Sequence, residues 1–196
     1  DFLELDIAAV CGGDAATPWK IVANLPYRVT TPILHRVREH SARFERSIVT
    51  VQAEVADRLR ARPGSRTYGA MTVAMQAHFV MEPVRTVPPQ AFFPEPDVVS
   101  QVICLQPHAE PVVPGINWGV FEQVVRGAFA QRRKTILNSL AGSGRLSAGP
   151  EEIADSLRAA GIDAGRRAET VSLEEFGALT RALARTNNGD ARTERG

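Results

Sequence analysis

Short apolar runs alternate with amphipathic segments through the first half of this 196-residue chain, and this alternation most restricts its fold. Aliphatic and β-branched residues predict strands at 20–23, 47–51, 79–86 and 98–105. Helical spacing predicts a helix after each of the first two strands and another at 68–77. Alternating strands and helices are typical of an α/β fold, so we expect a mainly parallel sheet with helices on both faces.

The composition changes after Leu105, and the change predicts a second, smaller domain. The segment 106–115 holds three prolines and a glycine, and only helices are predicted beyond it. Ser172 and Glu175 have the spacing of a capping box, and Gly161 suits a helix C-terminus. We therefore divide the chain into an α/β domain (1–107), a linker (108–115), an all-α domain (116–185) and a disordered tail (186–196).

The α/β domain is predicted to hold only the later strands of its sheet. An open α/β sheet binds its ligand where the strand order reverses, with strands on both sides of that point. The chain starts in Asp1-Phe2-Leu3-Glu4, and no glycine-rich strand-loop-helix precedes it in the sequence. We expect the chain to lack the N-terminal half of this domain.

Composition and charge exclude several classes of protein. A hydrophobic fraction of 44% and a charged fraction of 23% are those of a globular protein, and no apolar run could cross a membrane. Cys11 and Cys104 lie far apart, and the four histidines have no metal-binding spacing, so we expect free thiols in a reducing cytoplasm and no metal. We also expect a monomer. The net charge is only +1, but nine arginines against four acids between Arg28 and Arg66 permit a polyanionic partner.

The tetrapeptide Asn24-Leu25-Pro26-Tyr27 is the strongest candidate for chemistry, since it follows a strand and precedes a helix. The Asn24 side-chain oxygen and the Leu25 carbonyl could accept the two hydrogens of an exocyclic amine such as adenine N6. These bonds would favour a pyramidal nitrogen with its lone pair directed at a methyl donor. Pro26 restricts the direction of the Leu25 carbonyl, and Tyr27 could stack on an extruded base. The plainer interpretation is a strand-to-helix turn with a half-buried tyrosine.

A second loop strengthens the first interpretation. Residues 87–96 form a proline-rich segment that carries two aromatic side chains between two predicted strands. A base that is extruded from its stack needs a side chain against each of its two faces. Tyr27 could contact one face and Phe92 the other. The alternative is a hydrophobic plug beneath a crossover loop.

With these residues the chain resembles the small-subunit ribosomal RNA adenine N6-dimethyltransferases, the kasugamycin-resistance family. The resemblance runs from Asp1 to about Leu183, and its motifs are Asn24–Tyr27 with Thr31-Pro32, Gln52–Leu59, Tyr68-Gly69, Val87–Pro89 through Phe92, Pro94, Pro96 and Ser100, and Phe129–Ile136.

The resemblance implies a fold, an activity and site residues. The fold would be a Rossmann-like S-adenosylmethionine-dependent methyltransferase domain followed by the helical domain. The activity would be dimethylation of N6 of two adjacent adenosines near the 3′ end of the small-subunit rRNA, with the immature small ribosomal subunit as partner. Asn24 would contact the cofactor and the target amine, Tyr27 and Phe92 would enclose the base, and Asp1 would bind the cofactor's adenine. The family's glycine-rich cofactor loop should precede Asp1, and Asp97, Val99 and Cys104 depart from the usual residues.

The basic cluster Arg132-Arg133-Lys134 lies in a predicted helix at 118–140. Winding this helix places Arg132 on the apolar face, where we expect it to be partly buried and paired with a carboxylate across the domain boundary. Arg126 and Arg133 would lie on one edge and, with Lys134, bind RNA phosphates. A solvated basic face is the plainer interpretation.

Two alternative functions remain at this point. One is the related large-subunit rRNA adenine methyltransferase that confers macrolide resistance, although the motifs at 131–136 and 87–89 favour the small-subunit enzyme. The other is a non-catalytic ribosome-assembly factor.

Overall fold

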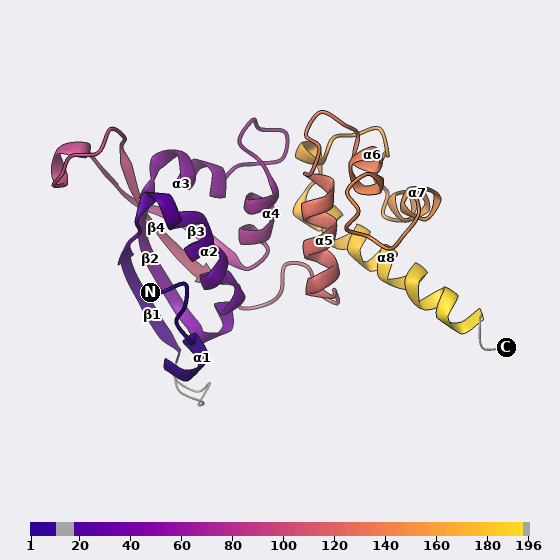
Figure 1. The fold of residues 1–196 in the computed structure, drawn as a ribbon, viewed down its shortest axis with the longest axis horizontal. Helices are drawn as coiled ribbons and strands as arrows, with labels where there is room; N and C mark the ends of the chain where they lie inside the picture. Colours follow the sequence, from indigo (N-terminus) through magenta and orange to yellow (C-terminus); the bar gives the residue numbers. More distant parts are fainter. Residues whose placement is uncertain (11–17, 194–196) are drawn as a thin grey trace. The chain divides into compact units, whose positions relative to one another are not determined.

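The structure is a computed structural model that describes residues 1–10 and 18–193, with side chains described up to residue 185 (Figure 1). The chain forms two compact units. The first, here called the sheet unit, consists of residues 1–60 and 78–110. The second, the helical unit, consists of residues 61–77 and 111–196.

The sheet unit is built on a mixed four-stranded sheet in the order β1-β2-β4-β3. Strand β2 pairs in parallel with β1 and antiparallel with β4, and β3 pairs antiparallel with β4. The expectation of a mainly parallel sheet is therefore wrong for the described strands. Only a short 3-10 turn and no α-helix separates β3 from β4, and strands joined without a helical crossover pair antiparallel. The elements of the unit are α1 (Ile7–Val10), β1 (Trp19–Asn24), α2 (Thr30–Glu39), β2 (Phe44–Gln52), α3 (Ala53–Leu59), β3 (Phe79–Val87) and β4 (Ser100–Pro107).

The two faces of this sheet are buried to different degrees. Val49 on β2 and its register partner Ile103 on β4 are at most 1% exposed, and α3 packs against β2, β3 and β4. On the opposite face, Val22 is 82% exposed although its register partner Ile48 is half-buried. The described helices therefore do not cover both faces of the described strands, contrary to the expectation.

The helical unit gathers its apolar side chains in one core. Its helices are α4 (Ala70–Gln76), α5 (Trp118–Ala128), α6 (Ile136–Ala141), α7 (Pro150–Ala159) and α8 (Leu173–Thr193). The predicted capping box is confirmed: the Ser172 amide donates to Glu175 Oε2 at 2.7 Å, and the Glu175 amide donates to Ser172 Oγ at 3.2 Å. Gly161 follows α7 with φ +72°, as its predicted place at a helix C-terminus requires.

The segment 61–77 lies in the helical unit and not, as the predicted boundary at 107 had it, in the α/β domain. Tyr68 is 1% exposed, and its hydroxyl donates to the Val171 carbonyl at 2.9 Å. Burial, together with nearby Glu174 and Glu175, raises the pKa of the Tyr68 hydroxyl. The segment joins the helical unit because its apolar side chains, Tyr68 and Val73 among them, belong to that core.

Two further boundaries differ from the sequence-based division. Val113, in the predicted linker, is 2% exposed and packs against Gly177 of α8, so part of the linker belongs to the helical core. Helix α8 continues to Thr193, beyond the predicted start of a disordered tail at 186, and residues 194–196 lie outside the described part. Each added residue extends a helix that is already nucleated, so a polar end can continue it.

The predicted continuous helix 118–140 is wrong, because α5 ends at Ala128 and α6 begins at Ile136. Two hydroxyl side chains stabilise the break. Ser139 Oγ donates to the Gly127 carbonyl at 2.9 Å and accepts from the Gln131 amide at 3.1 Å. Thr135 caps α6, since its hydroxyl accepts from the Asn138 amide at 3.4 Å.

No helix within the described residues is long and apolar enough to cross a membrane.

Candidate active site

The first loop of the candidate site, Asn24–Tyr27, is held in place by backbone bonds. The Leu25 amide donates to the Thr50 carbonyl of β2 at 3.1 Å, and the Leu25 side chain is 5% exposed. The Pro26 carbonyl accepts from the Val29 amide at 3.1 Å and from the Thr30 hydroxyl at 3.1 Å. Asn24 is the last residue of β1 and is exposed. The bonded backbone of the loop therefore presents the side-chain amide of Asn24 to solvent.

The second loop connects β3 to β4 and extends beyond the strands in Figure 1. It begins with a 3-10 turn at Pro89–Ala91, and the Phe92 amide donates to the Pro89 carbonyl at 3.1 Å. Phe92 is half-buried, whereas the next residue, Phe93, is fully exposed.

The structure brings the two loops together around a pocket of about 230 Å³. Five predicted site residues line it, together with three that the sequence analysis had not assigned to the site: Asn24, Leu25, Pro26, Tyr27 and Phe92, and then Phe93, Pro94 and Pro96. Its walls are aromatic rings and prolines, and its polar groups lie at the end of β1. A flat heterocycle with an exocyclic amine matches this distribution of apolar and polar surface.

Tyr27 is anchored by a residue to which the sequence analysis gave no role. The Tyr27 hydroxyl and Ser100 Oγ lie 2.6 Å apart, and Ser100 is fully buried at the start of β4. This bond holds the ring of Tyr27 at the side of the pocket. The sequence analysis named Ser100 only as a motif residue of the family resemblance, and that motif was the signal for it.

Asp1, the other predicted cofactor ligand, does not line this pocket. It is exposed, and its Oδ1 accepts from the Leu3 amide at 3.0 Å. The carboxylate of Asp1 and the exposed amide oxygen of Asn24 are both hydrogen-bond acceptors. Amino groups of an S-adenosylmethionine-type cofactor need such acceptors, so the chemistry of these two residues fits that group.

The predicted RNA-binding residues lie in two different elements of the helical unit. Arg126, on α5, faces Glu122 at 3.8 Å, while Arg133 and Lys134 are exposed in the turn between α5 and α6. The shared helical edge predicted for Arg126 and Arg133 therefore does not exist, since the helix ends between them.

Arg132 differs from its prediction in two respects. It is paired with a carboxylate, as expected, at 3.9 Å from Glu169. However, its side chain is 61% exposed, and Glu169 belongs to the same unit. Arg132 also donates to the Arg66 carbonyl at 2.9 Å, so it connects two turns of the helical unit.

Candidate metal ligands and cysteines are the remaining reactive side chains in the described part of the chain. No group of three or more His, Cys, Asp or Glu side chains within it could hold a metal ion. Cys104 is a free, half-buried thiol on β4, and Cys11 lies outside the described residues.

Comparison with known proteins gives one family. The model of the family "Ribosomal RNA adenine dimethylase" matches residues 1–185. The chain is 43% identical over 183 residues to the "Ribosomal RNA small subunit methyltransferase A" of Geobacter sulfurreducens, covering 93% of this chain and 66% of the relative. It is 44% identical to the protein of the same name from Syntrophotalea carbinolica, covering 93% and 67%. The chain thus spans about two thirds of the length of these curated relatives.

Two solved structures are similar in fold. One is a dimethyladenosine transferase from Plasmodium falciparum, with a TM-score of 0.75 and 18% identity over 90% of this chain and 72% of the other. The other is the 23S rRNA methyltransferase ErmE, with a TM-score of 0.62 and 24% identity over 94% and 70%. Both likenesses agree with the predicted Rossmann-like methyltransferase fold.

Proposed function

Because the chain belongs to the ribosomal RNA adenine dimethylase family, we propose that it methylates N6 of two adjacent adenosines near the 3′ end of small-subunit rRNA, with S-adenosylmethionine as methyl donor. Curated relatives named as small-subunit methyltransferases support this substrate over the large subunit. The partner would be the immature small ribosomal subunit in the cytoplasm, and the protein would act as a monomer.

One observation carries the proposal: the loop Asn24–Tyr27 and the loop that holds Phe92 line a single pocket. Two aromatic rings that line one pocket can enclose an extruded adenine, and each stacking contact contributes about 1–3 kcal/mol. The hydroxyl of Tyr27 is already bonded to Ser100, so little ordering remains when the base enters.

The polar end of the pocket would direct the target nitrogen. The adenine N6 lone pair is delocalised into the ring, which makes the nitrogen a poor nucleophile. Hydrogen bonds from N6 to the Asn24 oxygen and the Leu25 carbonyl would favour a pyramidal nitrogen, with its lone pair free for bonding. When bound, the cofactor supplies an electrophilic methyl group on a sulfonium. The fixed backbone of Leu25 keeps its acceptor in place, so catalysis rests on orientation and polarisation.

The helical unit would contribute contacts to the RNA backbone. Arg133 and Lys134 project from the exposed turn at 130–135 and can each approach a phosphate. Arg126 would contribute less, because Glu122 lies 3.8 Å away and offsets its charge.

The test is transfer of labelled methyl from S-adenosylmethionine to small ribosomal subunits from an unmethylated strain, with the label mapped to the nucleotide. Asn24→Ala should lower methylation at least about 100-fold, since it removes an acceptor used in the transition state, with less than about a twofold change in subunit binding. Asn138→Ala is the matched control, because Asn138 is an exposed asparagine in the helical unit.

Each outcome of this test separates the candidate functions. Label on two adjacent adenosines that is lost only in Asn24→Ala supports the proposal. Label on the large subunit would favour the macrolide-resistance type of methyltransferase. Subunit binding by the wild type without any label would support a non-catalytic assembly factor and contradict the proposal.

A further inference from the structure

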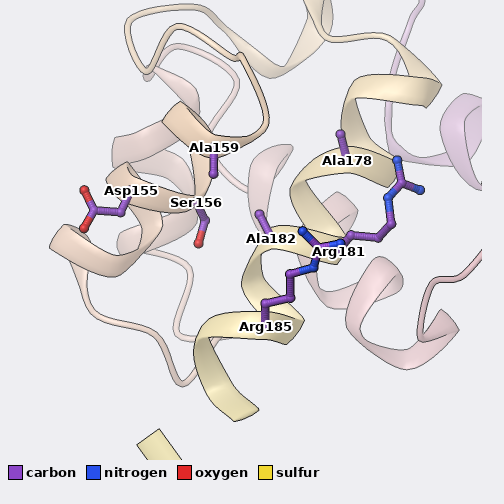
Figure 2. A pocket seen from close by; sticks show the side chains of 7 residues that line it. All are labelled: Asp155, Ser156, Ala159, Ala178, Arg181, Ala182 and Arg185. Atoms are coloured by element: carbon purple, nitrogen blue, oxygen red, sulfur yellow. The ribbon is translucent and has the colours of Figure 1, made fainter. Parts of the chain in front are cut away.

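A hollow of about 370 Å³ lies between α7 and α8 within the helical unit, and none of the candidate active-site residues lines it (Figure 2). Three alanines, Ala159, Ala178 and Ala182, form its apolar lining. Their side chains end at Cβ, so the two helices leave open space at this level. The hollow is large enough for a small organic group, and pockets of this size commonly hold ligands.

One polar side chain in the hollow has no partner among the described residues. Ser156 on α7 is 2% exposed, and its Oγ is buried without a hydrogen bond. Figure 2 shows its side chain on the side of α7 that lies nearer to α8. A buried serine or threonine in a helix usually bonds a carbonyl one turn earlier, as Thr180 does to Phe176 at 2.8 Å. The hydroxyl of Ser156 therefore lacks a partner, and a ligand group that reaches it on entering the hollow would supply one.

The charges around the hollow favour an anion. Arg185 is exposed, and in Figure 2 its guanidinium extends back along α8 toward Arg181. Arg181 is held by a bond to the Pro114 carbonyl at 3.1 Å. The one carboxylate at the rim, Asp155, points away from α8 in Figure 2 and is paired with Arg158 at 2.7 Å. The arginines and Ser156 thus offer hydrogen-bond donors, while the opposing charge is already neutralised.

We propose that this hollow binds one nucleotide of an RNA strand, with its phosphate at Arg185 and Ser156 and its sugar against the alanines. A guanidinium and a hydroxyl suit phosphate oxygens, and the apolar lining suits the carbon face of a ribose. The choice of RNA over another phosphate source rests on the proposed function. The site would be additional to Arg133 and Lys134, which lie in the turn between α5 and α6.

The first experiment measures binding of the full chain to a labelled fragment from the 3′ region of small-subunit rRNA at several salt concentrations. Arg185→Ala should weaken binding about tenfold and lower the log–log salt dependence by about 0.7–0.9, the value of one phosphate contact. Arg145→Ala removes the same charge from an exposed arginine of the helical unit that does not line the hollow, so it should change affinity less than about twofold. Equal effects of the two variants would overturn the proposal.

Ser156→Ala separates a ligand contact from a structural role. It removes a buried hydroxyl that has no partner, so the melting temperature should stay the same or rise. RNA affinity should nevertheless fall about three- to tenfold. Unchanged affinity, or a fall in affinity accompanied by a lower melting temperature, would contradict the proposed contact.

NMR titrations of the full chain with the RNA fragment and with inorganic phosphate distinguish the two sources of phosphate. We expect RNA to shift the amide signals of Ser156 and Ala182 at lower concentration than inorganic phosphate. Shifts with phosphate alone, or with neither, would overturn the inference. Methylation is measured separately, so a loss of RNA affinity in Arg185→Ala supports this site even if no methyl is transferred.

Discussion

The hydrogen bond between Tyr27 and Ser100 predicts that substituting either residue destabilises the protein, but by different amounts. Tyr27→Phe leaves Ser100 Oγ fully buried without its partner, which costs about 1–3 kcal/mol. Ser100→Ala leaves the Tyr27 hydroxyl without its partner, but Tyr27 is only half-buried, unlike Ser100. That substitution therefore costs only the net value of the bond, about 0.5–1.5 kcal/mol.

The double variant should be more stable than the sum of the single effects predicts. It removes both partners and leaves no buried polar atom unpaired, so we expect a coupling of about 1 kcal/mol. Urea unfolding can be followed by the fluorescence of Trp19, which lies in the sheet unit, in a Trp118→Phe background. A loss of 2 kcal/mol should move the unfolding midpoint by about 1 M.

Two results would refute this reasoning. If Ser100→Ala destabilises the sheet unit more than Tyr27→Phe does, the burial of Ser100 does not control the energy of the bond. If the two effects simply add, the hydroxyls are not bonded to each other in solution.

Three further predictions concern the helical unit. Glu175→Gln should destabilise the protein by about 1 kcal/mol or less at pH 7, since it replaces the carboxylate partner of Arg166. The hydrogen bond from Arg166 lowers the pKa of Glu175 below its ordinary value of 4.5. The pair therefore stabilises the protein fully above pH 4.5 and less as the pH falls through the lowered pKa. Over that pH range the urea midpoints of the wild type and Glu175→Gln should converge. Gly177→Ala should lower the melting temperature despite the better helix propensity of alanine, because the new Cβ would lie 2.6 Å from Val113 Cγ1 and 3.0 Å from Val113 Cβ; an unchanged melting temperature would contradict this close contact. Gly161→Ala should cost about 1 kcal/mol in thermal unfolding, since its φ is +72°, and equal stability would contradict the need for glycine there.

Local sequence signals predicted most elements but not how the strands pair. The β-branched run at 47–51 lies within β2, and the box at Ser172 and Glu175 begins α8 as expected. Strand direction and partner depend on distant segments, so the alternation of elements alone suggested a parallel sheet. The absence of an α-helix between 87 and 100 was the signal for antiparallel pairing of β3 and β4.

Helical periodicity wrongly predicted one continuous helix where polar side chains form hydrogen bonds with backbone groups. Residues 118–140 have apolar spacing that a single helix would satisfy, but Thr135 and Ser139 bond backbone groups at the break. Such bonds have no counterpart in a hydrophobic pattern. The position of Arg132 was therefore misjudged, although its pairing with a carboxylate was predicted.

The residues of the candidate site were predicted better than their supports. Asn24, Tyr27 and Phe92 carry side chains whose chemistry is legible without coordinates, and the structure places all three around one pocket. Ser100 acts only through its distance to Tyr27, and the open space beside Ser156 depends on the packing of two helices. Neither can be obtained from spacing along the chain.

The helical unit is formed from two separate segments of the chain, and this determines how the protein responds to proteolytic cleavage. Its core contains Tyr68 from the segment 61–77, whereas the rest of the core lies beyond residue 110. A protease cut between residues 110 and 111 would leave Tyr68 on the N-terminal fragment and its partner Val171 on the C-terminal one. The two fragments should elute together until the helical unit unfolds. A fragment that starts at 111 should fold poorly alone, and adding back a peptide of residues 61–77 should restore it.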